Sequence, residues 1–234
     1  LALHSAEESD GEVVNCDSLQ LYRHLNIGTA KLLPSQRCGV PHHLIDILDP
    51  DEVFTAGEYA RRARPLLSEI AGRGRLPIVV GGTGLYLRAL LEGLFPGPAG
   101  DAALRARLAA RQARRPGSLH RLLSRFDPHA AQRIHPGDVQ KLIRALEVCL
   151  LTGRPLSSWF AEGREPLRGF RTLKLGLDPP RQALYQRLEM RCEGMFAGGL
   201  VEEVRSILSL GFSPASKSLE SHGYRQALQI LQGE

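Results

Sequence analysis

Two short apolar runs, each followed by a turn and a helical pattern, constrain the fold more than any other feature of the sequence. Residues Glu12–Asn15 and Leu76–Val80 have the composition of buried strands. Between them, Phe54–Ala71 carries apolar residues at helical spacing, and Leu85–Leu91 repeats that pattern after the second run. The order strand, helix, strand, helix predicts a βαβ unit and therefore a parallel sheet.

The turns that follow the two predicted strands carry the residues best suited to chemistry. Cys16-Asp17-Ser18 follows the first strand, and Gly81-Gly82-Thr83-Gly84 follows the second. Open α/β sheets bind ligands at the carboxyl ends of their strands, where Asp17 could act as a base or could only form a turn. The glycine turn suits an anion through its backbone N–H groups, or serves only as a tight connection. The phosphate-binding pattern G-x-x-x-x-G-K-[ST] does not occur in the chain.

Positive charge is concentrated in one part of the chain. Asp101–Arg144 holds ten Lys and Arg against three Asp and Glu, whereas the remaining residues hold 20 and 22. Leucine spacing predicts helices up to Leu151, and Asp138 is a suitable N-cap. We therefore expect a basic helical insertion at 99–151 between two parts of an α/β core, 1–98 and 152–234. Such a segment favours binding of a polyanion, although an arginine-rich solvated surface is the alternative.

The C-terminal third combines one more predicted strand with two predicted helices. Leu173–Leu177 alternates like a strand, while Arg181–Met195 and Leu200–Leu210 have helical patterns. Arg187 and Arg191 stand four residues apart and so share one helix face. Two guanidinium groups suit a diphosphate, but salt bridges to glutamates of the same helix are the plainer alternative.

Cysteine, histidine and hydropathy patterns exclude several classes of protein. The four cysteines are far apart without a C-x-x-C pair, which argues against zinc or disulfides and favours a reducing cytoplasm. His42-His43 lacks a third ligand at a diagnostic spacing, so we expect a structural or RNA-facing role and no metal-ligating residues. No run approaches the roughly 18 apolar residues of a membrane span, and the N-terminus does not have the layout of a signal peptide.

Several longer stretches, taken together, resemble the bacterial tRNA dimethylallyltransferases, also called tRNA isopentenyltransferases. The matching stretches are CDSLQLYRHLNIGTAK, VPHHLIDILDP, LPIVVGGTGLYLRALLEGL, DPHAAQRIHPGDVQKLIRALEV with TGRPLS, LYQRLEMRCEGMFAGGLVEEV and HGYRQALQIL. The resemblance implies a P-loop-kinase-like parallel-sheet core with a helical insertion domain that binds the tRNA anticodon stem-loop. It also implies that the family's P-loop strand lies before Leu1 and its C-terminal portion beyond Glu234.

The activity implied by this resemblance is transfer of a dimethylallyl group from dimethylallyl diphosphate to N6 of adenosine 37 in tRNA, giving N6-isopentenyladenosine. Asp17 matches the family's general base, and Thr83 matches a residue of the reaction channel. Arg191, with Arg187 beside it, matches the arginine that binds the diphosphate, which Mg2+ accompanies. We expect a cytoplasmic monomer that does not bind a membrane.

The same resemblance implies a set of tRNA contacts around a base that must leave its stack. These residues are Asp17, Ser18, Leu19, Gln20, Thr83, Arg105, Gln140, Lys141, Leu142, Ile143, Arg144, Glu220, Ser221, His222, Gly223, Tyr224 and Arg225. The sequence departs from the family pattern at Gly137, where Asn is usual, and at His222, where Ile or Val is usual. Two alternatives remain: an ATP-dependent P-loop phosphotransferase, and a tRNA-binding fragment without activity.

Overall fold

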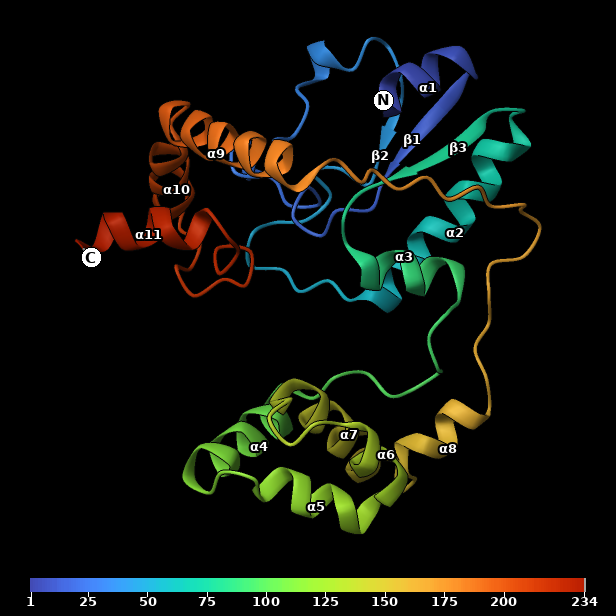
Figure 1. The fold of residues 1–234 in the computed structure, drawn as a ribbon, viewed down its shortest axis with the longest axis vertical. Coiled ribbons are helices and arrows are strands. Elements are labelled where there is room, and N and C mark those ends of the chain that lie inside the picture. The colour runs from blue at the N-terminus through green and yellow to red at the C-terminus, as the bar shows by residue number, and fades with distance from the viewer. Residues whose placement is uncertain (234) are drawn as a thin grey trace. The chain divides into compact units, whose positions relative to one another are not determined.

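The chain divides into two compact units in a computed structural model that describes residues 1–233. The first unit comprises Leu1–Leu91 and Leu167–Glu234, and the second comprises Glu92–Pro166 (Figure 1). The second unit extends beyond the predicted insertion, 99–151, at both ends. The reason is packing: Phe95 lies against the apolar core of this unit on one side, and Trp159 does so on the other.

The first unit contains a small parallel sheet, as the strand and helix order predicted. Its strands lie in the order β2-β1-β3, and both neighbours pair with β1 in parallel. Every residue of β1 is buried: Val13 and Val14 belong to the apolar core, whereas the polar Glu12 and Asn15 form hydrogen bonds. The elements before the second unit are α1 (Ala2–Glu8), β1 (Gly11–Asn15), η1 (Pro34–Gln36), β2 (His42–His43), α2 (Ala56–Gly72), β3 (Leu76–Val80) and α3 (Gly84–Leu91).

Helix α2 begins where the sequence supplies a capping box. The Thr55 side chain accepts a hydrogen bond from the Glu58 N–H, and the Glu58 carboxylate accepts one from the Thr55 N–H. The apolar face of the helix then packs on the sheet and on α3. Tyr59 stacks on Tyr86 with ring centroids 4.6 Å apart, so the helix that precedes β3 is fixed to the helix that follows it.

Three helices complete the first unit after an extended segment. They are α9 (Arg181–Ala197), α10 (Leu200–Ser209) and α11 (Tyr224–Gln232). Residues of α10 and α11 belong to the same hydrophobic core as β1, α2 and α3. Figure 1 shows α10 and α11 in contact with each other at the C-terminal end of the chain.

The predicted strand Leu173–Leu177 is wrong. This segment forms no ladder with β1, β2 or β3, and Leu173, Leu175 and Leu177 are 82%, 75% and 80% exposed. Alternation of apolar and polar residues shows which side chains share a face. It does not show that a neighbouring strand is in place to pair with the backbone and bury that face.

The second unit is helical throughout. Its helices are α4 (Ala102–Arg114), α5 (Ser118–Phe126), α6 (Pro128–Arg133), α7 (Val139–Thr152) and α8 (Leu156–Ala161). Asp101, Asp127 and Asp138 cap α4, α6 and α7, and the cap at Asp138 confirms the predicted start of α7. Across residues 1–233, no helix is long and apolar enough to cross a membrane.

A buried carboxylate joins α4 to α7 within the second unit. The Glu147 side chain is 0% exposed and accepts hydrogen bonds from Arg105 Nε at 2.7 Å, Arg144 Nη1 at 2.5 Å and the Asp101 N–H at 2.7 Å. Burial alone would raise the pKa of Glu147, but these donors hold it at about 2, below its ordinary value of 4.5. The carboxylate therefore stays ionised and holds Arg105 and Arg144 in ion pairs.

Replacing this carboxylate should destabilise the second unit. We expect Glu147→Gln to lower the free energy of unfolding by about 3 kcal/mol, because two guanidinium groups lose their charged partner. The matched control is Glu162→Gln, which removes only an exposed pair with Arg154. Denaturant unfolding followed by the fluorescence of Trp159, the single tryptophan, reports on this unit. Equal losses in both variants would contradict the assigned role of Glu147.

The same carboxylate should make stability depend on acid pH. Because the folded chain holds the pKa of Glu147 below 4.5, its contribution is complete above that pH and is lost as the pH falls toward 2. The difference in unfolding free energy between the parent and Glu147→Gln should therefore narrow between neutral pH and about pH 3. A constant difference over that range would show that Glu147 is not the titrating group.

Candidate active site

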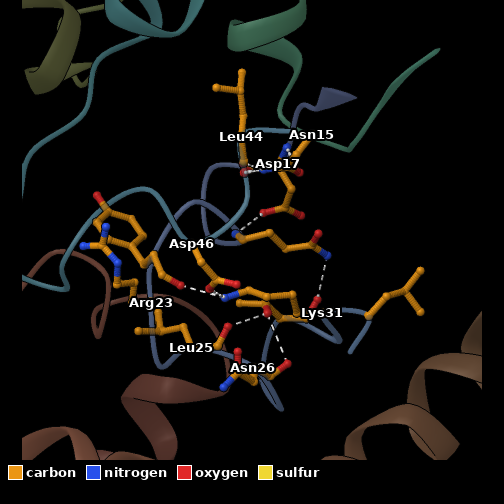
Figure 2. A network of polar contacts seen from close by, with 12 residues as sticks. Asn15, Asp17, Arg23, Leu25, Asn26, Lys31, Leu44 and Asp46 are labelled. Atoms are coloured by element: carbon orange, nitrogen blue, oxygen red, sulfur yellow. Dashed lines mark hydrogen bonds and ion pairs between the residues drawn. The ribbon is translucent and has the colours of Figure 1, made fainter. Parts of the chain in front are cut away.

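The loop after β1 holds Asp17 by one carboxylate oxygen. Asn15, the last residue of β1, orients the loop: its Nδ2 donates to the Leu44 carbonyl at 2.9 Å and to the Asp17 carbonyl at 3.0 Å (Figure 2). Asp17 Oδ1 accepts from the Leu19 N–H at 2.8 Å and the Gln20 N–H at 3.4 Å. Within the described part of the chain, Oδ2 accepts no hydrogen bond. It is therefore available to accept a proton.

The glycine turn after β3 packs directly on this loop. A Cβ at Gly81 would lie 2.2 Å from the carbonyl carbon of Cys16 and 2.6 Å from the Asp17 nitrogen, so only glycine fits. Thr83 Oγ1 accepts from the Ser18 N–H at 2.9 Å and lies 3.2 Å from Ser18 Oγ. The turn thus brings Thr83 beside Ser18, and the structure joins the carboxyl ends of β1 and β3 into one site.

A second set of polar contacts extends from this site into the turn at 26–31 (Figure 2). Gln20 Nε2 donates to the Thr29 carbonyl at 3.1 Å. Lys31 Nζ, which is buried, donates to Asp46 Oδ1 at 2.5 Å and to the Tyr22 carbonyl at 2.7 Å. Burial lowers the pKa of Lys31, while Asp46 opposes that shift. Sequence reasoning assigned no role to Thr29, Lys31 or Asp46, because only the folded loop brings them together.

The predicted tRNA contacts of the first unit fall into two environments. Asp17, Ser18, Leu19 and Gln20 lie together with Thr83 at the strand ends. In the segment 220–225, Glu220, His222 and Arg225 are exposed, and Ser221 and Gly223 are half-buried. Tyr224 is fully buried and donates its hydroxyl to Glu203, so its side chain belongs to the core rather than to the surface.

The predicted tRNA contacts of the second unit include residues that its core already uses. Leu142 and Ile143 are buried. Arg105 and Arg144 bind Glu147, although their side chains remain 44% and 34% exposed. Gln140 and Lys141 are exposed. Contacts at Leu142 and Ile143 therefore cannot be made by side chains in this arrangement.

Arg187 and Arg191 lie on α9, a helix that buries none of its residues. Neither guanidinium forms a hydrogen bond or an ion pair with any part of the chain that the structure describes. The predicted alternative of salt bridges to neighbouring glutamates is therefore not observed. Both side chains are open to an anion, but no hydrogen bond or ion pair joins α9 to the Asp17 loop in the same described range.

The two adjacent histidines have structural contacts. His43 Nε2 lies 2.6 Å from Glu12 Oε2, and His42 Nδ1 lies 2.8 Å from the Val40 carbonyl. Among residues 1–233, no group of three or more His, Cys, Asp and Glu side chains is arranged to hold a metal ion.

Comparison with solved structures defines the class of fold. The chain is similar to the full-length tRNA isopentenylpyrophosphate transferase from Bacillus halodurans, with a TM-score of 0.67 and 37% identity over 99% of this chain and 72% of that one. A eukaryotic dimethylallyltransferase acting on tRNA gives a TM-score of 0.76 and 29% identity over 96% and 56%. The molecule thus has the P-loop-kinase-like α/β fold of tRNA isopentenyltransferases, as predicted.

Sequence comparison then defines the family. A family model described as IPP transferase matches residues 20–234. The tRNA dimethylallyltransferase of Solibacter usitatus (strain Ellin6076) is 64% identical over all of this chain and 76% of its own length. That of Koribacter versatilis (strain Ellin345) is 55% identical over the same shares. The chain belongs to the tRNA dimethylallyltransferase family and is an enzyme that prenylates tRNA. This family membership favours the predicted prenyltransferase over the alternative of a phosphotransferase.

The close approach of Gly81 to Asp17 gives a direct test of the site's geometry. We expect Gly81→Ala to lower the free energy of unfolding by about 3 kcal/mol, because the new Cβ overlaps backbone atoms that cannot rotate away. Gly82→Ala is the matched control for folding, since a Cβ there would meet no atom within 4 Å among the described residues beyond its chain neighbours. Thermal unfolding of both variants measures the difference. Equal stability of the two would refute the packing of the turn on Cys16.

Proposed function

We propose that this enzyme transfers a dimethylallyl group from dimethylallyl diphosphate to N6 of adenosine 37 in tRNA, giving N6-isopentenyladenosine. Family membership shows that the enzyme prenylates tRNA. The proposal that the acceptor is N6 of adenosine 37 rests on the Asp17 carboxylate. Two backbone N–H groups hold Oδ1, while Oδ2 has no partner within residues 1–233. A carboxylate fixed at one oxygen and free at the other is arranged to accept a proton from a bound amine.

The proposed reaction needs such a base because the N6 amine of adenine is a weak nucleophile. Its lone pair is delocalised into the ring. As the bond between N6 and the allylic carbon forms, the carbon–oxygen bond to the diphosphate breaks and its electron pair leaves with the diphosphate. The proton of N6 passes to Asp17 Oδ2, which prevents positive charge from remaining on the nitrogen.

The developing charge on the diphosphate requires fixed cations. We assign this role to Arg187 and Arg191, and three observations support the assignment. The two residues are four apart on one helix face, both are exposed, and neither is used by an ion pair in the described chain. Guanidinium groups of this kind can each bind two phosphate oxygens.

Recognition of the tRNA is assigned to both units. Adenosine 37 must leave its stack to reach Oδ2 of Asp17, and Ser18, Gln20 and Thr83 are the polar groups beside that position. The second unit contains the whole basic segment 101–144, and its exposed Lys141 and Gln140 support binding of the anticodon stem-loop.

Mg2+ enters this proposal as the ion that accompanies the diphosphate. The described chain offers no cluster of ligands for a resident metal, so we assign no residue and no step to it. We also propose that the enzyme acts in the cytoplasm, because its four cysteines are all free thiols.

Removing the base should abolish turnover without abolishing binding. We expect Asp17→Asn in the full-length protein to lower kcat by about a hundredfold or more, because the carboxamide keeps the loop contacts of Oδ1 but cannot accept the proton. Transfer of label from dimethylallyl diphosphate measures kcat, and a gel shift with the anticodon stem-loop measures binding. The matched control is Asp49→Asn, which removes only the exposed pair with Arg23.

Two results would overturn the assignment. If Asp17→Asn turned over at the parent rate, the assignment of Asp17 as the base would be wrong. Labelling of a tRNA that carries guanosine at position 37, to the same extent as one that carries adenosine, would remove N6 of adenosine 37 as the acceptor.

A further inference from the structure

One carboxylate of the first unit binds an unusual number of neutral donors. Glu203, on α10, accepts from the N–H groups of Asn26 at 3.0 Å, Ile27 at 2.8 Å and Gly28 at 3.5 Å. Its Oε1 also accepts from the Tyr224 hydroxyl at 2.5 Å. No ion pair between Glu203 and a Lys, Arg or His occurs within residues 1–233. The carboxylate is therefore used to hold the turn that contains Asn26, Ile27 and Gly28.

Apolar packing closes the same contact. The ring of Tyr224 is fully buried, and a Cβ at Gly28 would lie 2.4 Å from its Cε2 atom. Only glycine lets the turn approach the ring this closely. Burial and the neighbouring Glu203 carboxylate raise the pKa of Tyr224, so its hydroxyl remains protonated and continues to donate.

The turn held in this way leads to Asp17 through a continuous set of contacts (Figure 2). The Thr29 carbonyl accepts from Gln20 Nε2, and the Gln20 N–H donates to Asp17 Oδ1. At the other end of the turn, the Lys31 N–H donates to the Asn26 carbonyl at 3.0 Å, which keeps the turn closed. A shift of the turn would therefore move Gln20, and with it a donor of the carboxylate.

We propose that Glu203 is a positioning residue of the prenyl transfer reaction. It acts through the turn and Gln20, and fixes the carboxylate of Asp17 relative to α10 and α11. A carboxylate that accepts several N–H groups is a strong anchor. Displacing a base by a fraction of an ångström is enough to slow proton transfer. The proposal rests on the proposed function only in treating Asp17 as the base.

Hydrogen exchange tests the anchor without reference to activity. In Glu203→Gln, the amides of Asn26, Ile27 and Gly28 lose a charged acceptor of the same size, and their exchange should accelerate by about tenfold or more. Tyr224→Phe, which removes one donor to the carboxylate, should give a smaller acceleration. Glu202→Gln is the matched control, because Glu202 is exposed and its carboxylate bonds only Arg205 among residues 1–233. Unchanged exchange in Glu203→Gln would overturn the anchor.

Kinetics then test whether the anchor acts on Asp17. We expect Glu203→Gln in the full-length protein to lower kcat by about tenfold, with the KM for dimethylallyl diphosphate changed less than about twofold. In the Gln20→Ala background, where the link to the turn is already broken, Glu203→Gln should lower kcat by less than about twofold. A merely structural effect would be the same in both backgrounds, and that result would overturn the positioning role.

The two proposals can fail separately. If the parent protein transfers nothing to adenosine 37, the proposed function is wrong, and the exchange experiment still decides whether Glu203 anchors the turn. If the parent is active and the exchange of the turn does not respond to Glu203→Gln, the positioning role is wrong while the proposed function stands.

Discussion

The backbone of Cys16 and Asp17 lies against Gly81 with no space for a side chain between them. This contact makes β1 and β3 end at the same level, and it brings Thr83 within hydrogen-bond distance of Ser18. The helix that follows, α3, in turn packs on α2 through Tyr86 and Tyr59. The position of the candidate base and the packing of the first unit thus depend on one close approach of backbone to backbone.

Local signals in the sequence were sufficient for much of the fold. The strands β1 and β3, the helix between them and the start of α7 at Asp138 depend on residues that are neighbours in the chain. Strand β2 was missed because it is only two residues long and is defined by its pairing with β1. The segment 173–177 failed for the related reason that a strand requires a partner.

The candidate base could be predicted from the sequence, but the residues that hold it in place could not. Asp17 follows a recognisable strand, and the family resemblance gave it a role. The residues that support it, such as Asn15 and Glu203, are polar groups whose partners lie 29 and 176 positions away in the sequence. The roles of the arginines could not be predicted either. A count of charges does not distinguish Arg105, which binds a buried carboxylate, from an arginine that is free to bind phosphate.

Asn26 and Glu203 are separated by 177 positions in the sequence. During synthesis from the N-terminus, the turn that Glu203 holds therefore leaves the ribosome long before its partner exists. All three strands are also made before α10 and Tyr224. The contacts of this turn with Glu203 can therefore form only after the whole sheet has been synthesised.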